Sequence, residues 1–133
     1  MKKVKTLKIL LPFMLLLFWV IGGCSKTLVL RANIKMTDWK QDYYEFLGEW
    51  SSVRIYYEIE NTGNVDIDYF EVYFEITCED GTKYYPHDIG LYAQVGQKYS
   101  YYFWVDVGGK KVSSVKITGW YLENWEYGLE VRK

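Results

Sequence analysis

Apolar and polar residues alternate along much of the chain after position 50, with the period of two that is typical of β-strands. The clearest runs are residues 50–60, 69–78 and 99–107. Because neighbouring side chains of a strand point to opposite faces, each run has one face suited to a core. The residues predicted to face the core are Val53, Ile55, Tyr57, Ile59, Phe70, Val72, Phe74, Ile76, Cys78, Tyr99, Tyr101, Phe103, Val105 and Val107.

Turn sequences separate these runs. Asn-Thr-Gly-Asn at 61–64, Glu-Asp-Gly-Thr at 79–82 and Gly-Gly-Lys-Lys at 108–111 supply residues that reverse the chain. Further strands are predicted at 27–35, 112–122 and 126–132, and a loop or a single turn at 38–47. About seven short strands with turns roughly every 8–12 residues predict an all-β, antiparallel β-sandwich. A closed barrel with a similar number of strands is the alternative.

The composition is that of one folded domain. The chain has 133 residues, of which 50% are hydrophobic and 20% aromatic, and a disordered chain is poor in both classes. Two Cys cannot form the network of disulfides that stabilises very small proteins. One of them, Cys78, falls on the apolar face of its strand, so we expect it to be buried and structural.

The first 24 residues have the organisation of an export signal. Residues 1–8 contain four Lys and no acid, and residues 9–23 form an uncharged, mostly apolar run of fifteen. A membrane-spanning helix needs about 20 apolar residues, so the run fits a signal-peptide core better. Its last residues, Ile21-Gly22-Gly23-Cys24, resemble the lipobox of bacterial lipoproteins. The resemblance implies that residues 1–23 are a lipoprotein signal peptide and that the Cys24 thiol is lipidated.

A lipidated Cys24 would hold the rest of the chain at the cell membrane, facing outside the cytoplasm, through its acyl chains. The alternative is an uncleaved anchor, which makes the chain a single-span membrane protein with the same orientation. Beyond residue 23, the chain has twelve Lys plus Arg against seventeen Asp plus Glu, a net charge of −5. An acidic module of this kind has no electrostatic footprint for nucleic acid, so nucleic acid is not an expected partner.

Residues 53–107 resemble the FxLYD domain, an immunoglobulin-like β-sandwich of bacterial and archaeal envelope proteins. The matching features are the strand that ends in Asn61-Thr62-Gly63, the long strand that runs into Asp80-Gly81, and the turn Val95-Gly96-Gln97 before an aromatic strand. The resemblance implies a single immunoglobulin-like sandwich with its core in residues 50–133. Residues 24–49 would hold the lipidated Cys, the first strand and a connecting loop. The resemblance also implies an interaction module, because the family has no catalytic site common to its members.

No residue pattern indicates catalysis, a metal or a cofactor. His87 is the only His, lies beside Pro86 in a predicted loop, and has no second ligand for zinc. The carboxylate pairs Asp66/Asp68, Glu58/Glu60 and Glu71/Glu75 share strand faces, but these faces are polar and general acid–base chemistry needs a desolvated group. Residues 64–68 offer oxygens to Ca²⁺ but lack the spacing of an EF-hand loop. We therefore predict that the protein is not an enzyme.

Aromatic residues occupy positions where the alternation predicts a polar face. Tyr56, Tyr69, Tyr73, Tyr102 and Trp104 lie opposite the apolar residues of their strands and are the candidate ligand-binding residues. Such rings offer partners a large contact area at low entropic cost. The structural alternative is that the rings pair across strands and stabilise the sheet by about 0.2–1 kcal/mol per pair. A domain of this size cannot bury all its rings, so some are expected to form an interaction surface.

The sequence therefore predicts a membrane-anchored lipoprotein whose β-sandwich is a non-catalytic binding or accessory module. The expected partner of its aromatic face is a membrane-associated protein. A module that grips cell-wall glycan and a passive spacer at the membrane are the two alternatives.

Overall fold

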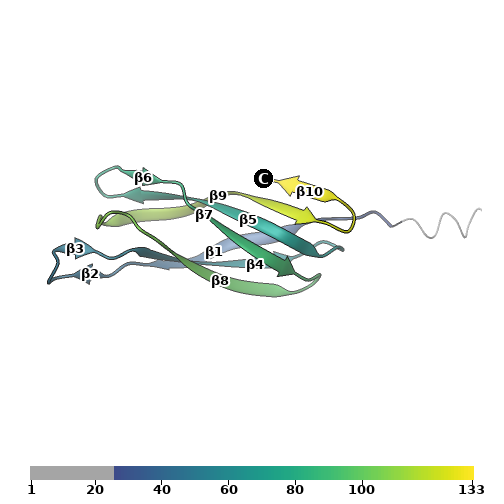
Figure 1. Ribbon diagram of the computed structural model, residues 1–133, viewed down its shortest axis with the longest axis horizontal. Helices are drawn as coiled ribbons and strands as arrows, with labels where there is room; N and C mark the ends of the chain where they lie inside the picture. Colours follow the sequence, from purple (N-terminus) through teal and green to yellow (C-terminus); the bar gives the residue numbers. More distant parts are fainter. Residues whose placement is uncertain (1–25) are drawn as a thin grey trace, which may run out of the picture.

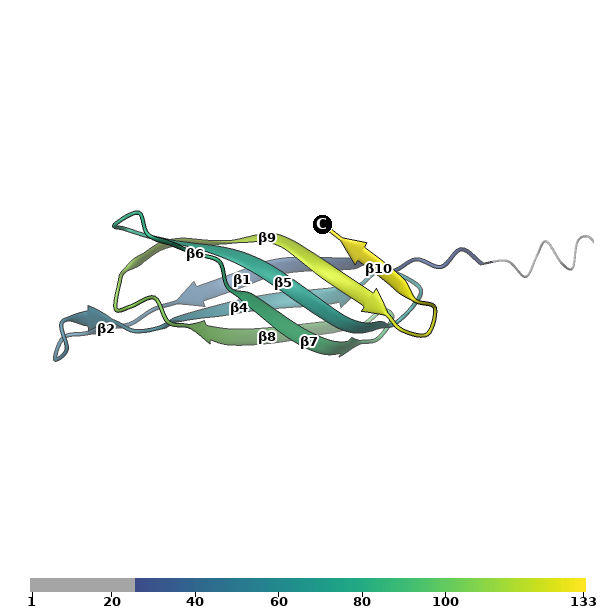
Figure 2. The same ribbon diagram turned by 45° about the horizontal axis from the view of Figure 1, so that its top comes forward.

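The computed structural model describes residues 26–133, which form two antiparallel β-sheets packed face to face (Figures 1 and 2). The first sheet, called here the three-stranded sheet, has the order β1 (Ala32–Lys40), β4 (Val53–Asn61), β8 (Lys98–Val105). The five-stranded sheet has the order β10 (Leu129–Arg132), β9 (Val112–Asn124), β5 (Ile67–Cys78), and the other edge of β5 pairs with β6 (Lys83–Tyr84) and β7 (His87–Ala93). β2 (Tyr43–Tyr44) and β3 (Glu49–Trp50) form a separate hairpin. The predicted antiparallel β-sandwich is confirmed.

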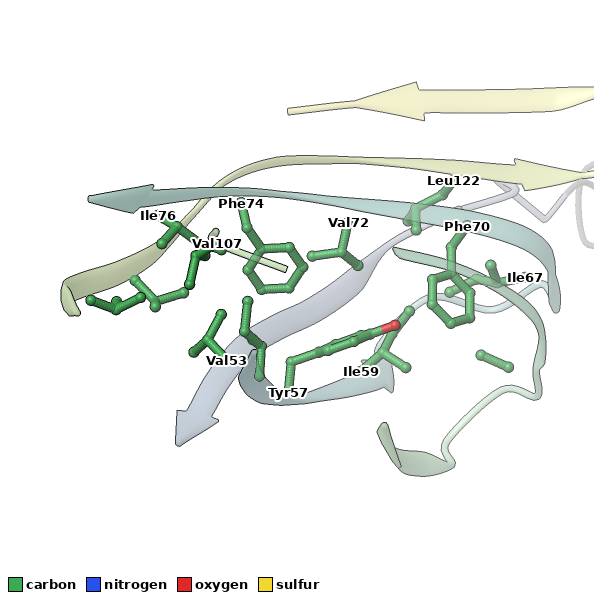
Figure 3. Close-up of a cluster of buried hydrophobic side chains, with 14 of the residues drawn as sticks. Val53, Tyr57, Ile59, Ile67, Phe70, Val72, Phe74, Ile76, Val107 and Leu122 are labelled. Carbon is green, nitrogen blue, oxygen red and sulfur yellow. The ribbon is translucent and has the colours of Figure 1, made fainter. Parts of the chain in front are cut away.

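The core lies between the two sheets and follows the predicted alternation. The inward side chains of β4 and of residues 70–78 of β5 are buried because both strands have a neighbour on each side. The inward side chains of β8 are only partly buried because β8 is an edge strand. Figure 3 shows the centre of this core, with Tyr57 from one sheet facing Phe70 and Phe74 from the other. Two edge-to-face ring pairs, Tyr57–Phe74 and Phe70–Tyr101, join the sheets.

The prediction of a loop or single turn at 38–47 is confirmed for the turn at 45–47 but was wrong for residues 38–40 and 43–44, which are in strands. β1 continues through Trp39, which packs against the core, and Tyr43–Tyr44 pairs with Glu49–Trp50. A β-bulge between Met36 and Asp38 shifts the alternation by one residue, so that Trp39 returns to the core side. A strict period of two that starts at residue 27 therefore assigns the residues after Met36 to the wrong faces, and the end of β1 was not recognised.

His87 begins strand β7, although a loop was predicted there. Strand β7 lacks the apolar–polar alternation because Gly90 takes an inward position and Tyr92 has a positive φ of 72°. At Gly90, a Cβ atom would overlap the ring of Phe70, so the position has no room for a side chain. The His87 side chain is exposed, as expected for a surface residue.

The chain enters the sandwich through residues 27–31, which are fixed to the turn after β4 instead of forming the start of a strand. The amides of Thr62 and Gly63 donate to the Arg31 carbonyl, and the Asn64 amide donates to Val29 O. The Asn64 side chain also donates to the Thr27 carbonyl at 2.8 Å. At Gly63, a Cβ atom would overlap the Val29 carbonyl, so the close approach requires glycine.

The predicted signal segment 1–23 and Cys24 lie outside the described residues. Between residues 26 and 133 there is no helix long and apolar enough to cross a membrane. The described chain enters at one end of the sandwich, and the β2–β3 hairpin projects from the opposite end, on the left of Figures 1 and 2.

Candidate binding surface

The five predicted binding residues lie on two opposite outer faces of the sandwich. Tyr56, Tyr102 and Trp104 are on the outer face of the three-stranded sheet, because they alternate with the inward residues of β4 and β8. Tyr69 and Tyr73 are on the outer face of the five-stranded sheet. All five point away from the core as predicted, but they cannot form one surface.

The three residues of the three-stranded sheet meet around Arg54. Tyr56 lies opposite Tyr102 and Arg54 opposite Trp104 in the β4–β8 register. The Arg54 guanidinium carbon is 3.9 Å from the centroid of the Trp104 ring, and Arg54 Nη1 donates to the Tyr56 hydroxyl at 2.9 Å. The Tyr56 and Tyr102 rings are 5.8 Å apart. We call Arg54, Tyr56, Tyr102 and Trp104 the aromatic platform.

The aromatic platform combines exposed rings with an oriented guanidinium, and a second cation lies beside it. Tyr102 is 61% exposed and Trp104 53% exposed, whereas Tyr56 is half-buried beneath its neighbours. Lys40, which lies beside Arg54 on β1, places its ammonium 5.5 Å from the centroid of the Tyr56 ring. Stacking and the hydrogen bond orient the Arg54 guanidinium before any ligand arrives. The arrangement suits an acidic or π-rich partner surface.

Sequence reasoning selected the rings of the platform but missed Arg54. The signal was present, since Arg54 precedes Tyr56 by two residues and therefore shares its face. Its stacking on Trp104 depends on the register between β4 and β8, which joins residues fifty positions apart.

On the opposite face, Tyr69 and Tyr73 are engaged by Glu71. Both hydroxyls donate to the Glu71 carboxylate, the Tyr69 bond measuring 2.6 Å. These bonds hold the pKa of the Glu71 carboxyl below its usual value and raise the pKa of Tyr69 to about 12. Both rings are half-buried. Their polar tips are thus already paired, so this pair fits the sheet-stabilising alternative better than a ligand site.

A second glutamate that accepts hydrogen bonds from two aromatic side chains lies on the neighbouring strand, β9. The Tyr121 hydroxyl and the Trp125 indole N–H each donate to Glu123 at 2.7 Å. Arg132 stacks on Tyr121, with the guanidinium carbon 4.6 Å from the ring centroid. Tyr69 and Tyr121 also form an edge-to-face pair at 6.3 Å. The outer face of the five-stranded sheet is therefore a network of tyrosines and glutamates that satisfy one another.

The acidic residues and the cysteine that the sequence singled out have structural partners in the described part of the chain. In the described part of the chain, no group of three or more His, Cys, Asp or Glu side chains could hold a metal ion. Asp66 and Asp68 accept hydrogen bonds from the backbone amides of Val95 and Trp125, so they close loops. Cys78 is 2% exposed, and burial raises the pKa of its thiol.

Comparison with known proteins adds no guide to the role of this surface. No model of a known protein family matches the chain, and no curated protein matches it. The functional assignment therefore depends on the physical properties of the domain. Exposed rings beside an oriented guanidinium are features typical of a binding surface.

Proposed function

We propose that the protein is a lipid-anchored, extracytoplasmic binding module of the immunoglobulin-like type. Its aromatic platform docks a membrane-associated protein partner. The observation that carries the proposal is the pair Tyr102 and Trp104, two rings more than half exposed on a regular sheet and flanked by Arg54. Aromatic and arginine side chains dominate the binding energy of protein interfaces. Because Arg54 and Lys40 are both cationic, the complementary surface of the partner is expected to be acidic.

The order of residues at the start of the chain supports the anchor. A basic segment, an apolar run too short to span a bilayer and Gly-Gly-Cys occur in sequence. Only residues 25 and 26 separate Cys24 from Thr27, whose carbonyl is already hydrogen-bonded to the domain. Three residue steps extend about 10 Å at most. A lipid on Cys24 would therefore hold this end of the sandwich directly against the membrane.

Replacing Cys24 with serine tests the anchor. In cells that make the protein, the chain is expected to incorporate labelled palmitate and to pellet with membranes, because its acyl chains are buried in the bilayer. The Cys24→Ser variant should lose the label and keep its full precursor mass. Equal mass and no label in both forms would instead identify an uncleaved single-span protein. Cys78→Ser is the matched control and should leave lipid incorporation unchanged.

Replacing Tyr102 and Trp104 together with serine tests the platform. Immobilised domain is exposed to detergent-solubilised membranes of the source cell, and the retained protein is titrated against each variant. Removing two central rings is expected to weaken retention about 100-fold or more, since such residues each contribute about 2 kcal/mol. Both side chains are more than half exposed, so stability should hold. Tyr85→Ser, at a residue 70% exposed outside the platform, is the matched control. Equal loss with both variants would refute the platform.

A glycan ligand is the second candidate. Tyr102 and Trp104 are two residues apart on one strand face, about 7 Å along the strand, so neighbouring sugar rings can stack on them. Cell-wall fragments would then shift the Trp fluorescence to the blue, and Trp104→Ser would abolish the shift. Such a result, with no retained protein, would replace the protein partner with a glycan.

A further inference from the structure

A second exposed apolar feature lies outside the platform, at the end of the β2–β3 hairpin. Phe46 is completely exposed, at 100%, and Leu47 is 63% exposed. Tyr44, just before them, is 49% exposed. We call residues 44–48 the tip. Phe46 lies on a projecting turn with no covering side chain, so it contributes nothing to the core. Its ring becomes stabilising only when a partner removes it from water.

The tip is held in a defined conformation. The amides of Leu47 and Gly48 both donate to the Tyr44 carbonyl, and Gly48 closes the turn with a positive φ of 67°. At the base of the hairpin, the Gln41 side chain bonds to three backbone groups, those of Ser51, Lys110 and Val112, at 2.7–2.9 Å. Insertion of the tip would therefore cost little conformational entropy.

The charge around the tip narrows the kind of partner. Asp42, Glu45 and Glu49 are exposed, and residues 41–50 contain no Lys or Arg. At the hairpin base, Lys110 and Lys111 are paired with Asp80 and Glu79 at 3.1 and 3.0 Å, and Lys40 is paired with Asp38 at 4.0 Å. Anionic lipid headgroups would repel this acidic collar, whereas a pocket lined with Lys or Arg would attract it.

The position of the tip indicates where such a partner lies. The hairpin extends from β1 and β4 at the end of the sandwich opposite the entering chain (Figures 1 and 2). Arg54 and Trp104 are at this same end, since Arg54 is the second residue of β4. With the chain anchored as in the proposed function, on which this inference rests, the tip points away from the anchoring membrane.

We propose that the tip inserts Phe46 and Leu47 into an apolar pocket on the protein partner, and that basic residues at the pocket rim pair with Glu45 and Glu49. The aromatic platform then contacts the same partner beside the pocket. The interaction has the usual form of an interface, with an apolar anchor surrounded by a polar rim.

Site-specific photocrosslinking in living cells tests the inference on the full-length chain. A photoreactive phenylalanine analogue replaces Phe46 in one strain, Tyr102 in a second and Leu91 in a third. Leu91 is the matched control because it is apolar and 61% exposed but lies on the other sheet. Position 46 is expected to crosslink to one protein, with a yield at least tenfold above that of position 91. The crosslinked peptide of the partner should be apolar, with Lys or Arg beside it in that protein. Charge reversal by Glu45→Lys with Glu49→Lys should reduce the yield at least tenfold, and Glu→Asp at both sites should not.

The remaining outcomes overturn the inference and separate it from the proposed function. Three outcomes would refute insertion into a basic pocket: crosslinks from position 46 to lipid, a crosslinking yield at position 46 no higher than at position 91, or a yield that charge reversal leaves unchanged. Crosslinking at 102 without 46 would retain the platform and exclude the tip. Crosslinking at 46 without 102 would support the tip and refute the platform, and failure at both positions would refute both.

Discussion

Replacing Phe74 with alanine is expected to lower the free energy of unfolding by about 3–5 kcal/mol, because the cavity left in the core cannot collapse. Phe74 is 1% exposed and its ring lies 5.6 Å from that of Tyr57 and 5.1 Å from that of Phe103. Figure 3 shows it projecting from β5 toward β4 between the two sheets. The loss is a large part of the roughly 5–15 kcal/mol that stabilises a domain.

Urea unfolding followed by Trp fluorescence measures this effect, and the molecule supplies a control of the same residue type. Phe46→Ser should change the unfolding free energy by no more than about 0.5 kcal/mol, because its side chain is fully exposed. Phe74→Leu, which fills most of the space, should cost clearly less than Phe74→Ala. Equal midpoints for the Phe74 and Phe46 variants would mean that the sheets do not pack through these rings.

Phe74 belongs to the part of the fold that the sequence predicts well. Strands β4 and β5 each have a partner on both sides, so every second residue is buried and the alternation is nearly perfect. Edge strands give a weaker signal. The bulge after Met36 changes the phase of β1, which was predicted at 27–35 and lies at Ala32–Lys40. Gly90 and Tyr92 interrupt the alternation of β7, which was not predicted.

The candidate site shows a different limit. Alternation correctly placed Tyr56, Tyr69 and Tyr102 away from the core, because side-chain direction is a local property. Which of them share a surface depends on strand pairing between distant segments. Tyr56 meets Tyr102 through the β4–β8 register, while Tyr69 lies on the other sheet. The hydrogen bonds to Glu71 depend on side-chain conformation, which the alternation does not predict.

Asn61 is the residue whose role the sequence conceals most. It was predicted as the first residue of a turn, yet it ends β4 and is 1% exposed. Its Nδ2 donates to the carbonyls of Val65 and Ala93, each at 2.9 Å, and its Oδ1 accepts from the Gly63 amide at 3.0 Å. One side chain thus joins the β4–β5 connection to the last residue of β7, at the end of the sandwich where the chain enters.

Replacing Asn61 with leucine, which has a similar volume, is therefore expected to lower the free energy of unfolding by about 3 kcal/mol. The substitution removes the Asn61 Nδ2 donor from the buried carbonyls of Val65 and Ala93, and unsatisfied buried groups cost about 1–3 kcal/mol each. The Gly63 amide loses one acceptor but keeps the Arg31 carbonyl. Urea unfolding gives the magnitude. Asn33→Leu, at an exposed position of β1, is the matched control and should cost about 0.5 kcal/mol or less.

The location of the damage distinguishes this prediction from general destabilisation. Because residues 27–31 bond to the turn at 62–64, loosening that turn also releases the segment that follows the proposed anchor. In the Asn61→Leu variant, amide hydrogen exchange should accelerate first at Thr62, Gly63 and Asn64, before it accelerates in β5. In the Phe74→Ala variant, the amides of both regions should accelerate together, since the core fails as a whole. Uniform acceleration in the Asn61 variant would mean that its hydrogen bonds hold no separate unit.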